Sequence, residues 1–409
     1  NGCASLTNLV IGDGVTYIGD FAFNQSCKVS NLVIGDSVTN IAFGVFCTGG
    51  LANLVIGNSV TGIPANVFGG NTNLTNVVIG SGVNTIGSSA FANCSGLRNV
   101  VIGSGVNTIG FMAFIWCSRL TSIDIPDSVI NIGEGAFHGC DSVTNVVIGH
   151  GVTNLSGFSF AISSNVATVA IGDGVTNIRD GCFSHCANLK TVLLGSNITS
   201  IGSRGFYQCT KLPAVIIPNS VTNIGDNAFE ECMSLANVAL GAGVISIGSN
   251  SFRACTNLTN IVIPESVASI GNRAFSYCFG LSNIYFRGNA PVAGNDVFFL
   301  STNLTVYYLP GALDWPVVPG LWPEGEYGRP TAYWLPEAMA EGLGVQAGLF
   351  GFNVGWAEGQ TVVVDACTTL ADPGWVPLET NIIAGDAYYF SDALWTNYPG
   401  RFYRIRHLP

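Results

Sequence analysis

The chain has 409 residues, of which 48% are hydrophobic and only 10% charged, and its formal net charge is −11. Size alone predicts two domains with ample apolar residues for a core, and no stretch approaches the roughly 18 consecutive apolar residues of a membrane span. Residues 1–310 carry 10 basic and 14 acidic side chains, and residues 311–409 carry 4 and 11, so there is no basic stripe for nucleic acid or anionic lipid.

A phenylalanine returns every 23 residues through most of the chain. A fixed period of this size is typical of solenoids, in which identical supersecondary units stack on their neighbours. The period predicts a solenoid over residues 1–304, with about 13 coils. The phenylalanines in strict register are Phe68, Phe91, Phe114, Phe137, Phe160, Phe183, Phe206, Phe229, Phe252, Phe275 and Phe298.

Residues 74–96 show what one coil contains. The opening residues alternate and are rich in β-branched types, which predicts a strand paired in parallel with its equivalent in the next coil. Residues 88–93 are predicted to form a single helical or 3₁₀ turn. Glycine at position 87 indicates either a positive φ or a close backbone approach. The positions expected to point inward are Leu74, Val77, Ile79, Val83, Ile86, Ala90, Phe91 and Cys94.

The outward strand positions form an asparagine-rich row beside an aliphatic row, with almost no charge. One interpretation is structural, because β-propensity and stacked amide hydrogen bonds explain such rows. The other is a ligand surface, because contiguous exposed aliphatic patches often mark interaction sites. Both remain open from the sequence. The candidate binding face consists of Asn76, Val78, Asn99, Val101, Asp124, Asn145, Val147, Leu193, Ile216 and Tyr285.

Most of the 13 cysteines lie three residues after a repeat phenylalanine, and this spacing predicts a ladder of free, buried thiols. Parallel Cβ vectors in neighbouring coils suit a disulfide poorly. Cys3 fits the ladder, Cys27 and Cys47 are out of register, and Ser163 interrupts it.

No motif in the chain predicts a catalytic, metal or cofactor site. The segment Cys182-Phe-Ser-His-Cys186 is the only candidate metal cluster, but it lacks a second ligand pair. His138, His150 and His407 fall at unrelated repeat positions, so a Ser-His-Asp arrangement is not supported. We therefore predict a protein that is not an enzyme and holds no cofactor.

The repeat phrase L-x-x-[VI]-x-[IL]-[GP]-x-[SG]-V-x-x-I-G-x-x-A-F-x-x-C resembles the BspA-like class of leucine-rich repeats of bacterial surface proteins. Residues 121–129 and 132–140 are close to the consensus of that class. The resemblance implies a right-handed arc with a parallel sheet on its concave side, adhesion or partner binding, and no catalytic residue.

The repeat decays near Asn303, and two further regions follow. Residues 305–341 are rich in proline and tryptophan and are predicted to be a cap and junction, or less favourably an aromatic platform for sugar. Residues 342–409 contain short alternating strands and predict a small β-sandwich-like domain. This domain resembles C-terminal β modules of bacterial secreted proteins, which implies an accessory or sorting role. Its arginines Arg401, Arg404 and Arg406 are expected to pair with Asp365 and Asp392.

The leading functional hypothesis is a non-catalytic extracytoplasmic binding or adhesion protein that uses the concave sheet for protein–protein contact. The alternative is a carbohydrate-binding or accessory protein that uses the tryptophan-rich cap and the C-terminal domain. The sequence begins within a repeat and has no signal peptide. We expect a trimmed mature protein, secreted or at a bacterial cell surface, with an unknown protein partner or a glycan and without membrane insertion.

Overall fold

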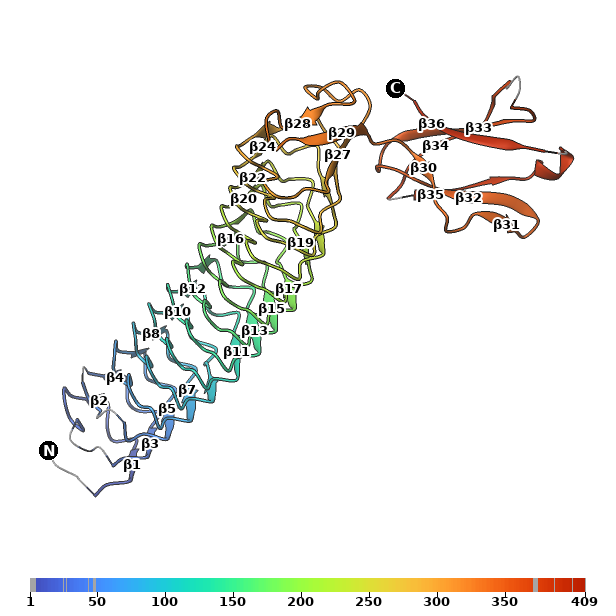
Figure 1. The fold of residues 1–409 in the computed structure, drawn as a ribbon. Helices are drawn as coiled ribbons and strands as arrows, with labels where there is room; N and C mark the ends of the chain where they lie inside the picture. The colour runs from blue at the N-terminus through green and yellow to red at the C-terminus, as the bar shows by residue number, and fades with distance from the viewer. Residues whose placement is uncertain are drawn as a thin grey trace. The chain divides into compact units, whose positions relative to one another are not determined.

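The computed structural model describes residues 5–24, 26, 28–42, 44–46, 49–370, 374–385, 387–398 and 400–408. The chain forms two compact units (Figure 1). The first unit consists of Asn1–Asn283, Pro291–Leu304 and Pro323–Arg329, and the second of Ile284–Ala290, Thr305–Trp322 and Pro330–Pro409. The predicted domain limits at residues 304 and 341 remain predictions. Cys3, Cys27 and Cys47 lie outside the described residues.

The first unit is a parallel β-solenoid, as predicted. Long strands of neighbouring coils pair in parallel and in register, for example Asn76 with Asn99 and Val78 with Val101. In Figure 1 these strands run along one side of the unit. They are β1 (Asn8–Ile11), β3 (Asn31–Ile34), β5 (Asn53–Ile56), β7 (Asn76–Ile79), β9 (Asn99–Val101), β11 (Ser122–Ile125), β13 (Asn145–Ile148), β15 (Thr168–Ile171), β17 (Thr191–Leu193), β19 (Ala214–Ile216), β21 (Asn237–Ala239) and β23 (Asn260–Ile263). The next long strand, β25 (Asn283–Phe286), belongs to the second unit except for Asn283.

Proline interrupts the ladder of long strands at identifiable places. Where the residue after the strand is glycine, its N–H donates to the preceding coil, as Gly172 does to the Ile148 carbonyl at 2.9 Å. Pro126, Pro218 and Pro264 occupy the same position and have no N–H to donate. The ladder breaks at β9/β11, at β17/β19 and at β21/β23, and each break directly precedes a proline coil.

A second ladder of two-residue strands runs along the opposite side of each coil (Figure 1). Ile86 pairs with Ile63 on one side and with Ile109 on the other. The short strands are β2 (Tyr17–Ile18), β4 (Asn40–Ile41), β6 (Gly62–Ile63), β8 (Thr85–Ile86), β10 (Thr108–Ile109), β12 (Asn131–Ile132), β14 (Asn154–Leu155), β16 (Asn177–Ile178), β18 (Ser200–Ile201), β20 (Asn223–Ile224), β22 (Ser246–Ile247), β24 (Ser269–Ile270) and β26 (Val292–Ala293).

The segment that carries the phenylalanine differs from the helical turn predicted for it. Within the coil, the Ala92 N–H donates to Ser89, while the N–H groups of Phe91 and Asn93 donate to Ala113 and Ile115 of the next coil. Ser89 and Asn93 have positive φ values of 54° and 58°, outside the range of a right-handed helix. The described part of this unit therefore has hydrogen-bonded turns, and no helix, on its third side.

Apart from the breaks in the strand ladders, each side of the coil is thus hydrogen-bonded to the next coil. Strand ladders keep a spacing of about 4.8 Å, so the rise is similar on the long-strand and short-strand sides. The coils in Figure 1 form one continuous stack whose direction changes only gradually from β1 to β19. We call the outward surface of the long strands β1 to β23 the long-strand face.

The interior of the solenoid contains one continuous stack of phenylalanine rings. Neighbouring ring centroids from Phe68 to Phe252 and on to Phe275 lie 5.0 to 5.4 Å apart and nearly parallel. All eight positions predicted to point inward in residues 74–96 are buried. Gly87 has no positive φ, but an added Cβ would lie 2.6 Å from the Ala65 nitrogen, so the close-approach interpretation is confirmed.

The predicted ladder of free, buried cysteines is confirmed for the described positions. Each thiol also donates to the carbonyl of the preceding coil's phenylalanine, as Cys94 does to Phe68 at 3.2 Å. Burial raises the pKa of the Cys94 thiol to about 12. Ser163 does not interrupt this pattern, because its hydroxyl makes the equivalent bond to Phe137 at 3.3 Å.

The second unit contains two antiparallel sheets around their own core, and all five strands predicted after residue 348 are present. Val354, Val362, Val364, Ile383 and Phe390 lie in this core. The strands are β27 (Thr305–Tyr308), β28 (Leu321–Trp322), β29 (Arg329–Tyr333), β30 (Glu337–Ala338), β31 (Gly344–Gln346), β32 (Leu349–Gly355), β33 (Thr361–Cys367), β34 (Val376–Ile382), β35 (Ala387–Asp392) and β36 (Phe402–His407), with one 3₁₀ turn, η1 (Trp395–Asn397). Within the described residues, no helix is long and apolar enough to cross a bilayer.

Candidate functional site

Nine of the ten residues of the candidate binding face lie together on the long-strand face. They come from β7, β9, β11, β13, β17 and β19, whose outward positions face away from the phenylalanine stack. The tenth, Tyr285, belongs to the second unit, where its ring packs on Tyr307 and Trp334 at centroid distances of 5.0 and 4.8 Å. Tyr285 therefore belongs to a different compact unit from the other nine residues.

The aliphatic row is exposed along most of its length. Val78 and Val101 are 42% and 56% exposed, and Leu193 and Ile216 reach 63% and 75%. Val147 is half-buried. Asp124 is the single charged residue in this row, and it aligns with Val147 of the next coil. The row is therefore an apolar strip with one carboxylate near its middle.

The asparagine row is held together by its own amides. The Asn76 amide donates to Asn53 at 2.9 Å, and the Asn99 amide donates to Asn76 at 3.0 Å. The second amide hydrogen of Asn76 is taken by the Thr75 hydroxyl. These bonds are the stacked amide hydrogen bonds that the structural interpretation of the row predicts. Both amide N–H groups of Asn76 are used in them, so a partner that covers Asn76 leaves neither N–H unsatisfied.

A shallow groove follows the aliphatic row where the long strands end. One stretch, of about 680 Å³, is lined by Val10, Val33, Val55 and Val78 and by the turns that follow their strands. A second stretch, of about 440 Å³, extends from Asp124 to Leu193 in the same part of the coil. The groove thus has an aliphatic floor.

Acidic and amide side chains form the outer wall of this groove, one position after the turn glycine or proline. The Asp127 carboxylate accepts the His150 N–H at 2.7 Å, and Asp173 accepts the Ser196 N–H at 2.7 Å. The Ser196 N–H and the Ser196 hydroxyl both donate to Asp173, and these hydrogen bonds lower the pKa of Asp173 below its ordinary value. The sequence analysis missed this row, although Asp, Asn or Ser recurs there at the repeat period. We call Asp13, Asp36, Asp127, Asp173 and Glu265 the acidic edge.

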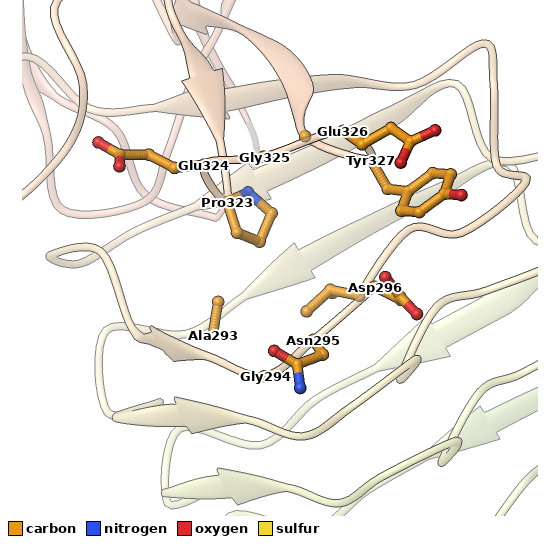
Figure 2. A pocket seen from close by; sticks show the side chains of 11 residues that line it. Ala293, Gly294, Asn295, Asp296, Pro323, Glu324, Gly325, Glu326 and Tyr327 are labelled. Atoms are coloured by element: carbon orange, nitrogen blue, oxygen red, sulfur yellow. The ribbon is translucent and has the colours of Figure 1, made fainter.

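A separate hollow of about 470 Å³ lies at the end of the first unit. Figure 2 shows it between the segment from Ala293 to Asp296 and the segment from Pro323 to Tyr327, with carboxylates from both. Asp296 is already paired with Arg273 at 3.1 Å. Glu324 and Glu326 are exposed to solvent.

The structure does not assemble the metal cluster considered for residues 182–186. Cys182 and Cys186 are buried, and the Cys186 thiol donates to Phe160, whereas the His185 ring packs edge-on against Tyr207. His138 packs against Trp116 instead, and burial lowers the pKa of its imidazole. Throughout the described chain, no group of three His, Cys, Asp or Glu side chains is placed to hold a metal ion.

The aromatic residues of the predicted cap pack mainly on one another. The rings of Tyr308 and Trp315 stack at 4.8 Å and 4°, and Phe286 packs on both Trp315 and Trp322. Trp322 is only 6% exposed. Stacked and buried rings leave little free face for a sugar, which weighs against the aromatic platform.

The C-terminal arginines pair with local acids, as predicted. Arg404 and Arg406 contact the Asp365 carboxylate at 2.6 and 2.9 Å, and Arg401 lies 3.0 Å from Asp392. The Asp365 side chain is 1% exposed. Arg404 and Arg406 are therefore engaged within their own sheet, whereas Arg401 pairs with an acid of β35 in the other sheet.

Comparisons with solved structures return bacterial repeat proteins. A leucine-rich repeat protein of T. pallidum shares 29% identity over 40% of this chain and 78% of its own, with a TM-score of 0.38. A leucine-rich repeat protein of Bacteroides ovatus shares 27% over 62% and 84%, with a TM-score of 0.32. A leucine rich cell surface protein of Faecalibacterium prausnitzii shares 23% over 70% and 84%, with a TM-score of 0.35. A search of curated proteins gave no match.

A family model places the repeats. The model of the BspA type leucine rich repeat region matches six copies, over residues 1–120, 107–236 and 176–305. These matches cover the predicted solenoid and well over half of the chain. The 23-residue period, the stacked phenylalanines and this match agree, and the chain belongs to the BspA type leucine-rich-repeat family.

Proposed function

We propose that this protein is a non-catalytic binding or adhesion protein, secreted or held at a bacterial cell surface, that docks a protein partner on its long-strand face. Leucine-rich-repeat proteins of this family generally bind proteins and are generally non-catalytic. The observation that carries the proposal is the exposed aliphatic row of the long-strand face, bordered by an asparagine row whose amides bond from coil to coil between Asn8 and Asn99.

The aliphatic row is better suited to docking than an ordinary surface. Single exposed apolar residues are common on soluble proteins, but contiguous apolar strips usually mark interaction sites. Val55, Val78 and Val101 align directly from coil to coil and are all at least 39% exposed. A partner that covers them gains apolar burial, and it leaves the amide donors of the neighbouring asparagines paired.

The test replaces Val78, Val101 and Val147 together with aspartate. The side chains face away from the core, so circular dichroism should show an intact fold. Binding to host or bacterial surface material should fall at least tenfold, because a docked partner would lose apolar contacts and meet unpaired charge.

A matched control uses Ile130→Asp with Ile245→Asp. These isoleucines are 44% and 50% exposed and directly precede the short strands β12 and β22, away from the long-strand face. This variant should bind like the parent protein. Unchanged binding by a folded triple variant would move the contact site off the long-strand face and contradict the proposal.

A further inference from the structure

We propose that the long-strand face pairs with the same face of a second copy of this chain. This inference rests on the proposed function, because it takes that face to be a protein-docking surface and names the occupant. It is drawn from the charges along the two edges of the face, from the weak curvature of the stack, and from the area available.

The two edges of the long-strand face carry opposite charge. The acidic edge follows the strands. Five basic residues lie one or three positions before the strands, at the other edge, and we call them the basic edge: Lys28, Arg98, Arg119, Lys190 and Lys211. All ten side chains of the two edges are at least partly exposed.

Within the described residues, these charges have almost no ionic partners in their own chain. None of the basic edge makes an ion pair, and on the acidic edge only Asp173 has one, with His150 at 3.7 Å. The side chains across the face from one another are too far apart to meet, since about eight extended residues separate them and each spans about 3.3 Å. Both edges are therefore free to pair with another molecule.

Symmetry decides which arrangement satisfies both edges. When a two-fold axis runs parallel to the stack of coils, rotation places the acidic edge of one copy over the basic edge of the other. A two-fold axis across the stack would instead place like charges together. The favourable arrangement is parallel and keeps equal coils level. Two coils carry both signs, Lys28 with Asp36 and Arg119 with Asp127, and each would pair with its opposite in the other copy.

The arrangement also accommodates the single charge of the aliphatic row. The midline of the face lies between its two outward rows, so the aliphatic row of one copy covers the asparagine row of the other. Asp124 of one copy then faces the Ser122 hydroxyl of the second copy. Arg119 of that second copy comes three residues before Ser122, so Asp124 also lies on the side of its basic edge. From Asn31 to Asn99, each asparagine amide already donates one hydrogen to the asparagine of the preceding coil, so covering this part of the row leaves those hydrogen bonds in place.

The face is large enough for a stable contact. Its twelve strands from β1 to β23 are spaced about 4.8 Å apart, and each strand is four residues or fewer. The resulting area is about 700 Å² per copy before the edges are counted, close to the roughly 800 Å² per partner of a standard interface. Because the stack bends little, two such faces can contact along most of their length.

Sedimentation of the full chain over a range of concentrations tests the pairing. We expect a species with twice the 42.7 kDa mass of the chain. A basic-edge variant, Lys28→Glu with Arg119→Glu, should raise the dimer dissociation constant at least tenfold, because each new carboxylate then faces Asp36 or Asp127 of the other copy. An acidic-edge variant, Asp36→Lys with Asp127→Lys, should do the same, and circular dichroism checks its fold because the two parent carboxylates accept the N–H groups of Asn58 and His150. Mixing the two variants should restore the dimer, because each then meets opposite charge on both edges.

Charge reversals away from the face provide the control. Arg179→Glu with Glu134→Lys changes exposed residues on the short-strand side and should leave the dimer unaffected. A wild-type chain that stays monomeric, or variants that fail to complement on mixing, would overturn the self-pairing. Such a result would leave the proposed function standing if the aspartate variant of Val78, Val101 and Val147 still loses binding to surface material.

Discussion

At the scale of single residues, the position three after each phenylalanine has two roles in the core. It fills volume beside the rings, and it donates to the phenylalanine carbonyl of the coil before, as Cys209 does to Phe183 at 3.3 Å. Ser301 makes the same bond to Phe275 at 2.7 Å, and Asn71 holds the same position with a bond to Phe68 of its own coil. The position therefore requires a small or compact donor rather than a cysteine as such.

Burial of the thiols predicts a loss of stability at alkaline pH. The pKa of Cys94 rises from 9.0 to about 12 in the folded chain. The unfolded chain releases this proton near pH 9 and the folded chain does not, so stability is full below pH 9 and falls as the pH rises toward 12. The measurement is the urea midpoint between pH 7 and 11.

The control for this prediction is Cys186→Ser with Cys209→Ser and Cys232→Ser. Serine already occupies the equivalent position at 163 and 301, so the variant should fold and its midpoint should fall less steeply above pH 9. Equal pH dependence in both proteins would show that the thiols do not carry the effect.

The sequence predicted which residues face inward because strand alternation and the 23-residue period determine burial directly. It did not predict the hydrogen bond of the cysteines, because a cysteine in an apolar ladder is read as a small hydrophobe. Serine at position 163 was the one indication in the sequence that this position needs a hydrogen-bond donor, but the repeat pattern presents it as an interruption of the cysteine ladder. Its hydroxyl in fact preserves the bond.

At the scale of the coil, the turns are determined by the neighbouring coils rather than by local preference. Positions with positive φ include Ser89, Trp116, Arg204 and Tyr277, which share no residue type. Their N–H or C=O groups bond across to the adjacent coil, and these bonds select the left-handed conformation. A single-sequence interpretation has no signal for this, so small residues before the phenylalanine were interpreted as a helical turn.

Close packing between coils predicts at which copies of a repeat position glycine resists replacement, since serine occupies the position of Gly14 and Gly151 at 128, 220 and 266. A Cβ on Gly151 would lie 1.8 Å from the Asp127 carbonyl oxygen, whereas a Cβ on Gly14, at the same repeat position, would meet nothing within 4 Å. Gly151→Ala should lower the free energy of unfolding by about 1–3 kcal/mol or more, because backbone must move. Gly14→Ala should be neutral or slightly stabilising, by up to about 1 kcal/mol.

Chemical denaturation of both glycine variants checks this expectation. A similar stability for the two would contradict the view that coil-to-coil contact, and not the turn itself, requires glycine at this position. Gly14 and Gly151 share a local sequence context, so local turn propensity cannot separate them.

At the scale of the whole molecule, the sequence predicted both the solenoid and a small β domain. Period and composition specify these architectures, and nine of the ten candidate residues share one face because the period places equivalent positions in line. Tyr285 was grouped with them by the same period, but its packing on Tyr307 and Trp334 belongs to the second unit. The acidic and basic edges were not predicted, since their residues vary in type and the period shows only their position.

Each unit has a core of its own, and Asp365 provides a way to perturb one core alone. Burial opposes ionisation of this carboxyl, but hydrogen bonds and charge from Arg406 and Arg404 hold its pKa below 3.8. A carboxyl with a lowered pKa contributes stability above its unfolded pKa, near pH 4, and loses it as the pH falls further. Acid should therefore weaken the sheet of β33, β34 and β36.

Asp365→Ala should destabilise the second unit by roughly 2–4 kcal/mol at pH 7. A broken buried pair costs about 3–5 kcal/mol, and the figure is reduced because both guanidinium groups reach water. Hydrogen exchange resolved by peptide should show faster exchange in β33 and β36 and unchanged exchange around Phe183. The control is Glu358→Ala, whose carboxylate lies 3.8 Å from Arg287 and is 58% exposed, so its loss should be negligible. Unchanged exchange in β33 after loss of Asp365 would mean that its ion pairs with the arginines do not stabilise this sheet. Faster exchange around Phe183 would show that the stability of the solenoid core depends on that of the second unit.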